Sequence, residues 1–384
     1  MIPPFCPNPF CFAHRVEYTS PDGLPFFLER GTYTTKVVGS VQRFRCKLCG
    51  RGFSARTFSI DYYTKKTLDN REIFRAIAAG ESVSSIARHL HCSFGSAQNR
   101  LERLGRNAIF MQSKLMESLA FKEDLVADGF ESFTKSQYHP CNINILVGKK
   151  SQFLYEATYT TLRRKGRMTE QQKKKRDLIE ARYRPRPAAL RKSCWRLFDQ
   201  INEHWCRENK ESMTLSTDEH KVYPIALADV KGLEEDRKQE TFIHKQYSSK
   251  AERTLHNPLF SVNYYDRELR KDMATFRRES TCFSRNISSG MLRFMSHMVW
   301  HNYEKSHRIV STAKKPPVHA VEAGMEESQI QAAFEALFTE RPFMTHTWLS
   351  NEAATIWYKE YQTPLKKRPE YLPRYATMGL LHCS

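Results

Sequence analysis

Short apolar runs and helix-period patterns alternate along the chain, and their order predicts a mixed α/β fold. Between residues 73 and 104, apolar residues recur every three or four positions in three successive segments, which indicates three amphipathic helices. Three apolar runs within 125–159 have the length of buried strands. A helical pattern over 188–205, a fourth run at 213–217 and a further helix over 223–228 complete the series.

Two of the predicted strands end in an aspartate, Asp128 after the first run and Asp218 after the fourth. A single aspartate at a strand end also serves as a helix cap or a turn residue. Two carboxylates brought together from separate strands, however, form a site for a hard cation such as Mg²⁺ or Mn²⁺, which prefers oxygen ligands. Three strands, a helix, a strand and a helix, with acids on the first and fourth strands, is the order of a ribonuclease H-like domain.

Four of the ten cysteines form two close pairs near the start of the chain: Cys6 with Cys11, and Cys46 with Cys49. Tetrahedral Zn²⁺ needs four soft ligands, which two such pairs supply. The runs at 31–38 and 41–45 predict a β-hairpin between the pairs, so a zinc ribbon is expected over 1–58. The spacing of the first pair is wide, which leaves His14 as an alternative ligand.

The three helical segments have helix-turn-helix spacing, and a DNA-binding unit is expected over 66–112. On the third helix the buried stripe is formed by Ala97, Leu101 and Leu104. The opposite side carries three residues expected to face solvent: Asn99, Arg103 and Arg106. Because Asn pairs with adenine and Arg with guanine in the major groove, this side has suitable chemistry for reading DNA. Three-helix units of this kind also occur as plain packing modules.

The chain is strongly basic, with 61 Lys and Arg against 42 Asp and Glu among 384 residues and a net charge of +19. This balance predicts a polyanionic partner. A basic insertion at 163–186 has the composition of a solvated run, as most such runs are, but it could also follow phosphates, with Lys174 as one contact. The sequence has neither an apolar run of membrane-spanning length nor a signal peptide, so a cytosolic protein is expected.

The chain resembles bacterial insertion-sequence transposases that combine a zinc ribbon, a helix-turn-helix and a DDE nuclease domain. The similar stretches are 43–53 (RFRCKLCGRGF), 128–133 (DGFESF), 216–218 (STD), 257–263 (NPLFSVN) and 269–284. Together they cover roughly residues 1–300. Their order and number, more than any single stretch, carry the resemblance.

The resemblance implies that a ribonuclease H-like mixed-sheet domain over 122–303 performs the chemistry. Asp128 and Asp218 would hold two metal ions, Mg²⁺ or Mn²⁺, for phosphoryl transfer. Matching the segment before Leu269 places Asn263 where many such enzymes have a glutamate. Asp266 lies one helical turn further on and could substitute, because a carboxylate holds Mg²⁺ more tightly than a neutral amide does.

The function implied is a transposase that binds the terminal inverted repeats of its own element and cuts and joins strands there. Its partners would be double-stranded DNA, as element ends and target, and further copies of the chain in a dimer or larger assembly in the bacterial cytoplasm. Two alternatives are a catalytically degenerate, transposase-derived regulator that only binds DNA, and a structure-specific nuclease without strand transfer. A helical C-terminal extension over 304–384 has no assigned role.

Overall fold

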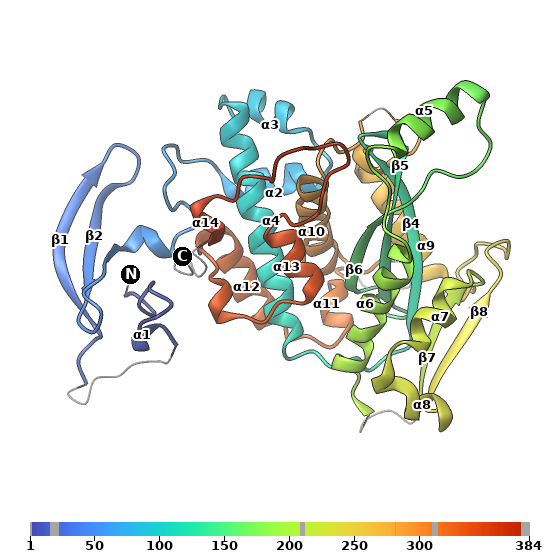
Figure 1. The fold of residues 1–384 in the computed structure, drawn as a ribbon. Coiled ribbons are helices and arrows are strands. Elements are labelled where there is room, and N and C mark those ends of the chain that lie inside the picture. The colour runs from blue at the N-terminus through green and yellow to red at the C-terminus, as the bar shows by residue number, and fades with distance from the viewer. Residues whose placement is uncertain (1, 16–22, 208–211, 281, 309–313, 378–384) are drawn as a thin grey trace.

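The computed structural model describes residues 2–15, 23–207, 212–280, 282–308 and 314–377. Figure 1 shows a small β module at one end of the molecule, a layer of helices in the middle and a larger sheet at the other end. The expected mixed α/β class is confirmed. None of the helices in the described ranges is long and apolar enough to cross a membrane.

The N-terminal module is a three-stranded antiparallel sheet in the order β1-β2-β3. Its elements are α1 (Phe12–Arg15), β1 (Phe27–Thr35), β2 (Gly39–Cys46), β3 (Gly52–Ser54) and a short 3-10 helix at Ala55–Phe58. The module has a small core of its own, in which Phe26, Phe27 and Phe44 pack beside the cysteines. A core this small is insufficient for a stable domain, which makes a structural metal or outside packing necessary.

The middle layer begins with the three predicted helices, α2 (Asn70–Ala78), α3 (Val83–His89) and α4 (Phe94–Met116). Each starts at a polar side chain that accepts hydrogen bonds from the first turn: Asp69, Ser82 and Ser93. Such caps satisfy backbone N–H groups that the helix itself leaves unpaired.

Later parts of the chain enclose α4. The elements are α10 (Ile287–Tyr303), α11 (His319–Glu322), α12 (Glu327–Thr339), α13 (Asn351–Trp357) and α14 (Arg374–Thr377). Helix α10 is buried almost throughout and crosses α4 so closely that a Cβ atom at Gly105 would lie 2.7 Å from Leu292 Cβ. One continuous hydrophobic core runs from Ile60 to Ala376 and includes this layer and the large sheet.

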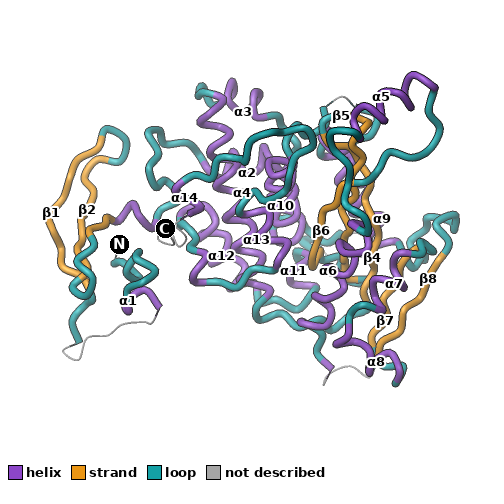
Figure 2. Tube along the Cα trace, in the orientation of Figure 1, coloured by secondary structure: helices purple, strands orange, loops and turns teal. Residues whose placement is uncertain are grey.

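The large sheet has five strands in the order β6-β5-β4-β7-β8. Its strands are β4 (Leu125–Thr134), β5 (Ser136–Gly148), β6 (Leu154–Thr161), β7 (Met213–Asp218) and β8 (Phe242–Tyr247). The pairs β4–β5 and β5–β6 are antiparallel, whereas β4–β7 and β7–β8 are parallel. Figure 2 shows the strands gathered in two places, with helices between them.

The remaining helices are α5 (Glu170–Glu180), α6 (Ala189–His204), α7 (Val222–Ala228), α8 (Glu234–Lys238) and α9 (Phe260–Asp272). Helices α6 and α9 cover opposite faces of the sheet. Asn144 on β5 donates a hydrogen bond to Ser193 on α6 and is paired with Gly129 on β4. The residue after Gly129 on β4, Phe130, lies under the Arg270 guanidinium on α9. Since successive strand residues point to opposite faces, Asp128 points toward α9.

Candidate functional site

The two predicted aspartates lie on neighbouring strands, near the point where the pairing of β4 with β7 ends; we call this place the sheet edge. Asp218 is the last residue of β7, as predicted. The prediction that Asp128 ends its strand is wrong, because β4 continues to Thr134. Strands β4 and β7 are parallel neighbours, with Leu125 paired to Leu215 and Val126 to Ser216. Two residues further along both strands, Asp128 is level with Asp218 and on the same face. The two carboxylates are close enough that the charge of Asp218 contributes to a raised pKa of Asp128.

Asp128 lies in a shielded environment at this edge. Its Oδ1 accepts hydrogen bonds from the Gly129 N–H at 2.7 Å and from the Tyr223 hydroxyl at 3.4 Å. Burial is the main cause of its raised pKa, because a buried carboxylate loses solvation, and the negative charge of Asp218 adds to this effect. The side chain is therefore held in one orientation while its charge is only partly compensated.

Asp218 is fixed by the end of β7 and by the neighbouring strand. Its Oδ1 accepts the His220 N–H at 2.9 Å, and its carbonyl accepts the Gln246 side chain at 3.2 Å. The preceding Thr217 hydrogen-bonds His244 of β8 at 2.9 Å. Strand β8, which the sequence pattern did not predict, thus supports this aspartate from the side away from β4.

A third carboxylate reaches the same edge from helix α9. Burial raises the pKa of Asp266 well above its ordinary value, and the next largest cause is the charge of Asp128. The Oδ1 atom of Asp266 is shielded from solvent and has no hydrogen-bond partner in the structure. Asn263 lies one turn earlier on α9 and is half-buried. Of these two residues only Asp266 carries a charge, and it lies near enough to Asp128 for the two carboxylates to interact.

Two further residues at this edge were not singled out from the sequence. Tyr223 on α7 contacts Asp128, as described above. Arg253, an exposed residue between β8 and α9, is a basic side chain whose charge lowers the pKa of both Asp128 and Asp266. No pattern marks a lone arginine in a loop, so only the fold could reveal its position.

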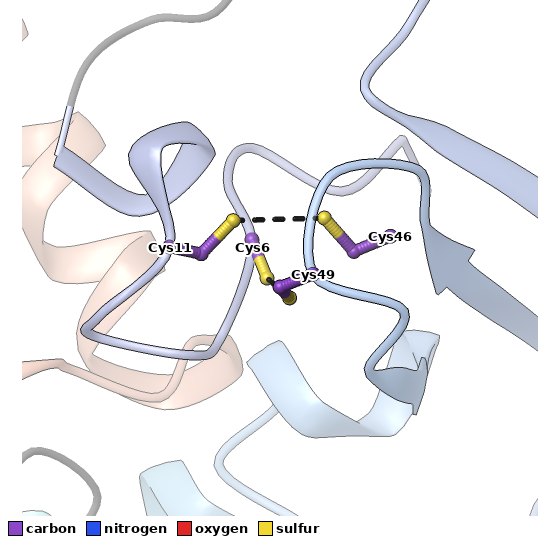
Figure 3. A group of neighbouring side chains, drawn as sticks. All are labelled: Cys6, Cys11, Cys46 and Cys49. Carbon is purple, nitrogen blue, oxygen red and sulfur yellow. Dashed lines mark hydrogen bonds between the residues drawn. The ribbon is translucent and has the colours of Figure 1, made fainter.

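The four cysteines of the two predicted pairs come together in the N-terminal module (Figure 3). Their sulfur atoms all lie within 4.8 Å of one another, with Cys6 and Cys49 3.6 Å apart and Cys11 and Cys46 3.7 Å apart. A Zn–S bond of about 2.3 Å in tetrahedral geometry requires sulfurs roughly 3.8 Å apart. The cluster therefore fits a structural zinc ion. Among the residues that the structure describes, it is the one group of three or more possible ligands this close together.

The backbone around the cluster is shaped for this role. Gly50 has φ of +70°, and its N–H donates to the Cys46 carbonyl at 3.0 Å, which closes a tight turn around the second pair. His14, the alternative ligand, is used elsewhere. Its Nδ1 lies 2.6 Å from the Cys6 carbonyl and its Nε2 2.6 Å from Thr345 Oγ1, so it joins the cysteine loop to the C-terminal segment.

The structure contradicts the expected solvent exposure of Arg103 and Arg106 on α4. Arg103 is buried and donates to the Ile60 carbonyl at 2.6 Å, and Arg106 is fully buried and donates to the Trp357 carbonyl at 3.1 Å. The physical reason is that α12, α13 and α14 cover this side of α4. Asn99 is half-buried and accepts a hydrogen bond from Arg103 at 2.8 Å. These arginines are structural anchors and are not available to read a DNA groove.

Lys174, in contrast, is exposed on α5. This helix has no buried residue and extends away from the body of the molecule, next to the β5 end of the sheet in Figure 1. Nearby, Lys175 Nζ lies 5.1 Å from the centre of the Tyr138 ring. The helical part of the basic insertion is therefore a protruding arm.

No protein-family model matches this chain, and no curated protein matches it either.

Proposed function

We propose that this chain is a DNA transposase whose catalytic domain is ribonuclease H-like. The observation that carries the proposal is the placement of Asp128 and Asp218 on neighbouring parallel strands, with Asp266 of α9 near enough for the charge of Asp128 to contribute to its raised pKa. Asp128 comes from the first strand of the domain, Asp218 from the fourth and Asp266 from the helix after the fifth. The strand order and the mixed strand directions support the same conclusion. In this proposal Asp266, and not Asn263, is the third acid.

In this proposal the three aspartates bind a hard divalent cation. Three like-charged groups partly removed from solvent, one with an unpartnered oxygen, are unfavourable without a compensating positive charge. Bound there, Mg²⁺ or Mn²⁺ would neutralise charge on the phosphate and favour ionisation of the attacking hydroxyl or water. The three aspartates would hold the cation, Tyr223 would orient Asp128, and Arg253 would contact the phosphodiester.

DNA binding is supported by the charge and by the exposed arm. The Lys and Arg excess is large, and Lys174 with its neighbours on α5 presents several ammonium groups to solvent. Such contacts position the DNA backbone without reading its sequence. The cysteine cluster, in this proposal, binds zinc for stability and takes no part in the chemistry.

The test is incubation of the full-length protein and Mg²⁺ with supercoiled plasmid that carries the flanking DNA of the gene. A transposase should nick this plasmid and join the released ends to a second DNA. Nicking without joining would indicate a structure-specific nuclease. Binding with no nicking at any Mg²⁺ or Mn²⁺ concentration would refute the enzyme and favour a DNA-binding regulator.

A further inference from the structure

A groove of about 720 Å³ lies between the N-terminal module and the helical layer. Its walls come from the loop between the first two cysteines, from all three strands of the module, from residues 56–63 and from the C-terminal Arg374. Four arginines line it: Arg43, Arg51, Arg56 and Arg374. None of the described residues that line the groove is acidic, so the groove favours an anionic ligand.

Three of these arginines are accessible to such a ligand. Arg43, Arg51 and Arg374 are exposed, and none of the four forms an ion pair among the described residues. Arg56 is half-buried and has a different task. It donates to the carbonyls of Asp61 at 2.8 Å and Thr64 at 3.0 Å and so braces the loop that carries Tyr63.

Tyr63 presents an aromatic ring at the groove. Its φ of +57° is in the left-handed region, which bulky residues rarely adopt, and its side chain is 66% exposed. The ring stands edge-on to Tyr62 at 4.5 Å, and its hydroxyl accepts a hydrogen bond from Arg374 at 3.3 Å. An exposed aromatic ring held in an unfavourable backbone conformation suggests a binding role.

We propose that this groove binds an unpaired stretch of a DNA strand, with a base stacked on Tyr63 and phosphates on Arg43, Arg51 and Arg374. Basic grooves that contain aromatic rings bind single strands in this way, because every base has a flat face to stack. The volume is that of a pocket for a drug-sized molecule, which is enough for a few nucleotides and too small for a duplex. The choice of DNA rests on the proposed function.

The test is fluorescence anisotropy of the full-length, zinc-loaded protein with a labelled oligothymidine and with a blunt duplex, without added Mg²⁺. Tyr63→Ala should weaken oligothymidine binding about 5- to 150-fold and leave duplex binding unchanged. Tyr63→Phe keeps the ring and should bind nearly as tightly as the original protein. Tyr371→Ala is the matched control, because Tyr371 is 79% exposed and lies outside the groove; it should change neither affinity.

Arg43→Ala provides a second variant that does not depend on stacking. It should weaken oligothymidine binding and lower its salt dependence by about one phosphate contact. The proposal would be overturned if Tyr63→Ala lost affinity equally for oligothymidine and for duplex, or if the original protein did not bind oligothymidine. The result is separable from catalysis: oligothymidine binding by an original protein that cleaves no DNA at any Mg²⁺ or Mn²⁺ concentration would support the groove and count against the transposase proposal alone.

Discussion

Asp266 on α9 and Asp128 on β4 lie close enough for the charge of Asp128 to raise the pKa of Asp266, which burial already raises. The two residues come from elements far apart in the sequence, and α9 is held across the sheet by a 2.7 Å hydrogen bond from Ser261 to the Lys149 carbonyl. A third carboxylate is thus held near Asp128.

The identity of the third acid can be tested by comparing two alanine variants. Asp266→Ala should lower Mg²⁺-dependent cleavage at least ~100-fold, because it removes charge from the proposed metal site. Asn263→Ala should have a small effect. Cleavage rates measured across a range of Mg²⁺ concentrations decide between the residues. Loss of cleavage in Asn263→Ala together with cleavage retained in Asp266→Ala would identify Asn263 as the third ligand.

The burial of Arg106 predicts a stability defect. Arg106→Ala would leave the Trp357 carbonyl and Glu102 without this partner inside the protein, at a cost of about 3–5 kcal/mol in the free energy of unfolding. Arg88→Ala, on the exposed side of α3, is the control and should change the free energy of unfolding by less than about 0.5 kcal/mol. Urea denaturation measures both. Equal stability of the two variants would mean that α13 does not cover α4 in solution.

Many of the elements, though not strand β8, and the convergence of the cysteines could be predicted from the sequence because both depend on local patterns. Apolar periodicity marks α2, α3 and α4, and close cysteine spacing marks the metal cluster. Asp128 and Asp218 could be singled out because each follows an apolar run. In each case, residues near one another in the chain carry the signal.

The exposure of α4 could not be predicted in this way. Ala97, Leu101 and Leu104 are buried as expected, but Arg103 and Arg106 on the other side are buried too. Their cover comes from segments more than two hundred residues later, and the long arginine side chains bury their stems while their charged ends find backbone carbonyls. No local pattern separates such an arginine from a solvent-facing one.

The cysteine cluster predicts about one zinc ion per chain in protein purified under reducing conditions. Cys46→Ser should lose the zinc and destabilise the N-terminal module, since the metal supplies much of the folding free energy of small modules of this kind. Cys282→Ser, at an exposed cysteine outside the cluster, should keep the zinc. Metal analysis by mass spectrometry measures both. Zinc-free original protein, or zinc retained by Cys46→Ser, would contradict the assignment.

Buried histidines predict a loss of stability in acid. The rings of His301 and His319 stack 4.1 Å apart; burial lowers the pKa of His301 well below its ordinary value and that of His319 to about 3. The unfolded chain binds protons at these residues near pH 6.5 whereas the folded chain does not, so stability falls as the pH decreases below 6.5.

His319→Asn isolates this effect. Between pH 7 and pH 5 the original protein should lose about 2 kcal/mol more unfolding free energy than the variant, because one pH unit corresponds to about 1.4 kcal/mol for one proton. Urea denaturation at several pH values measures the difference. Parallel pH profiles for the two proteins would show that His319 is protonated in the folded state.

The most direct test of the catalytic proposal is the rate of Mg²⁺- or Mn²⁺-dependent strand cleavage by Asp128→Asn and Asp218→Asn, measured beside their DNA affinity. Each substitution keeps the size of the side chain and removes one negative charge from the sheet edge. We predict that both variants bind DNA as the original protein does and lose cleavage at either metal, with Asp177→Asn on the exposed arm as an active control. Cleavage at the original rate in either variant would contradict the assignment of this edge as the catalytic site.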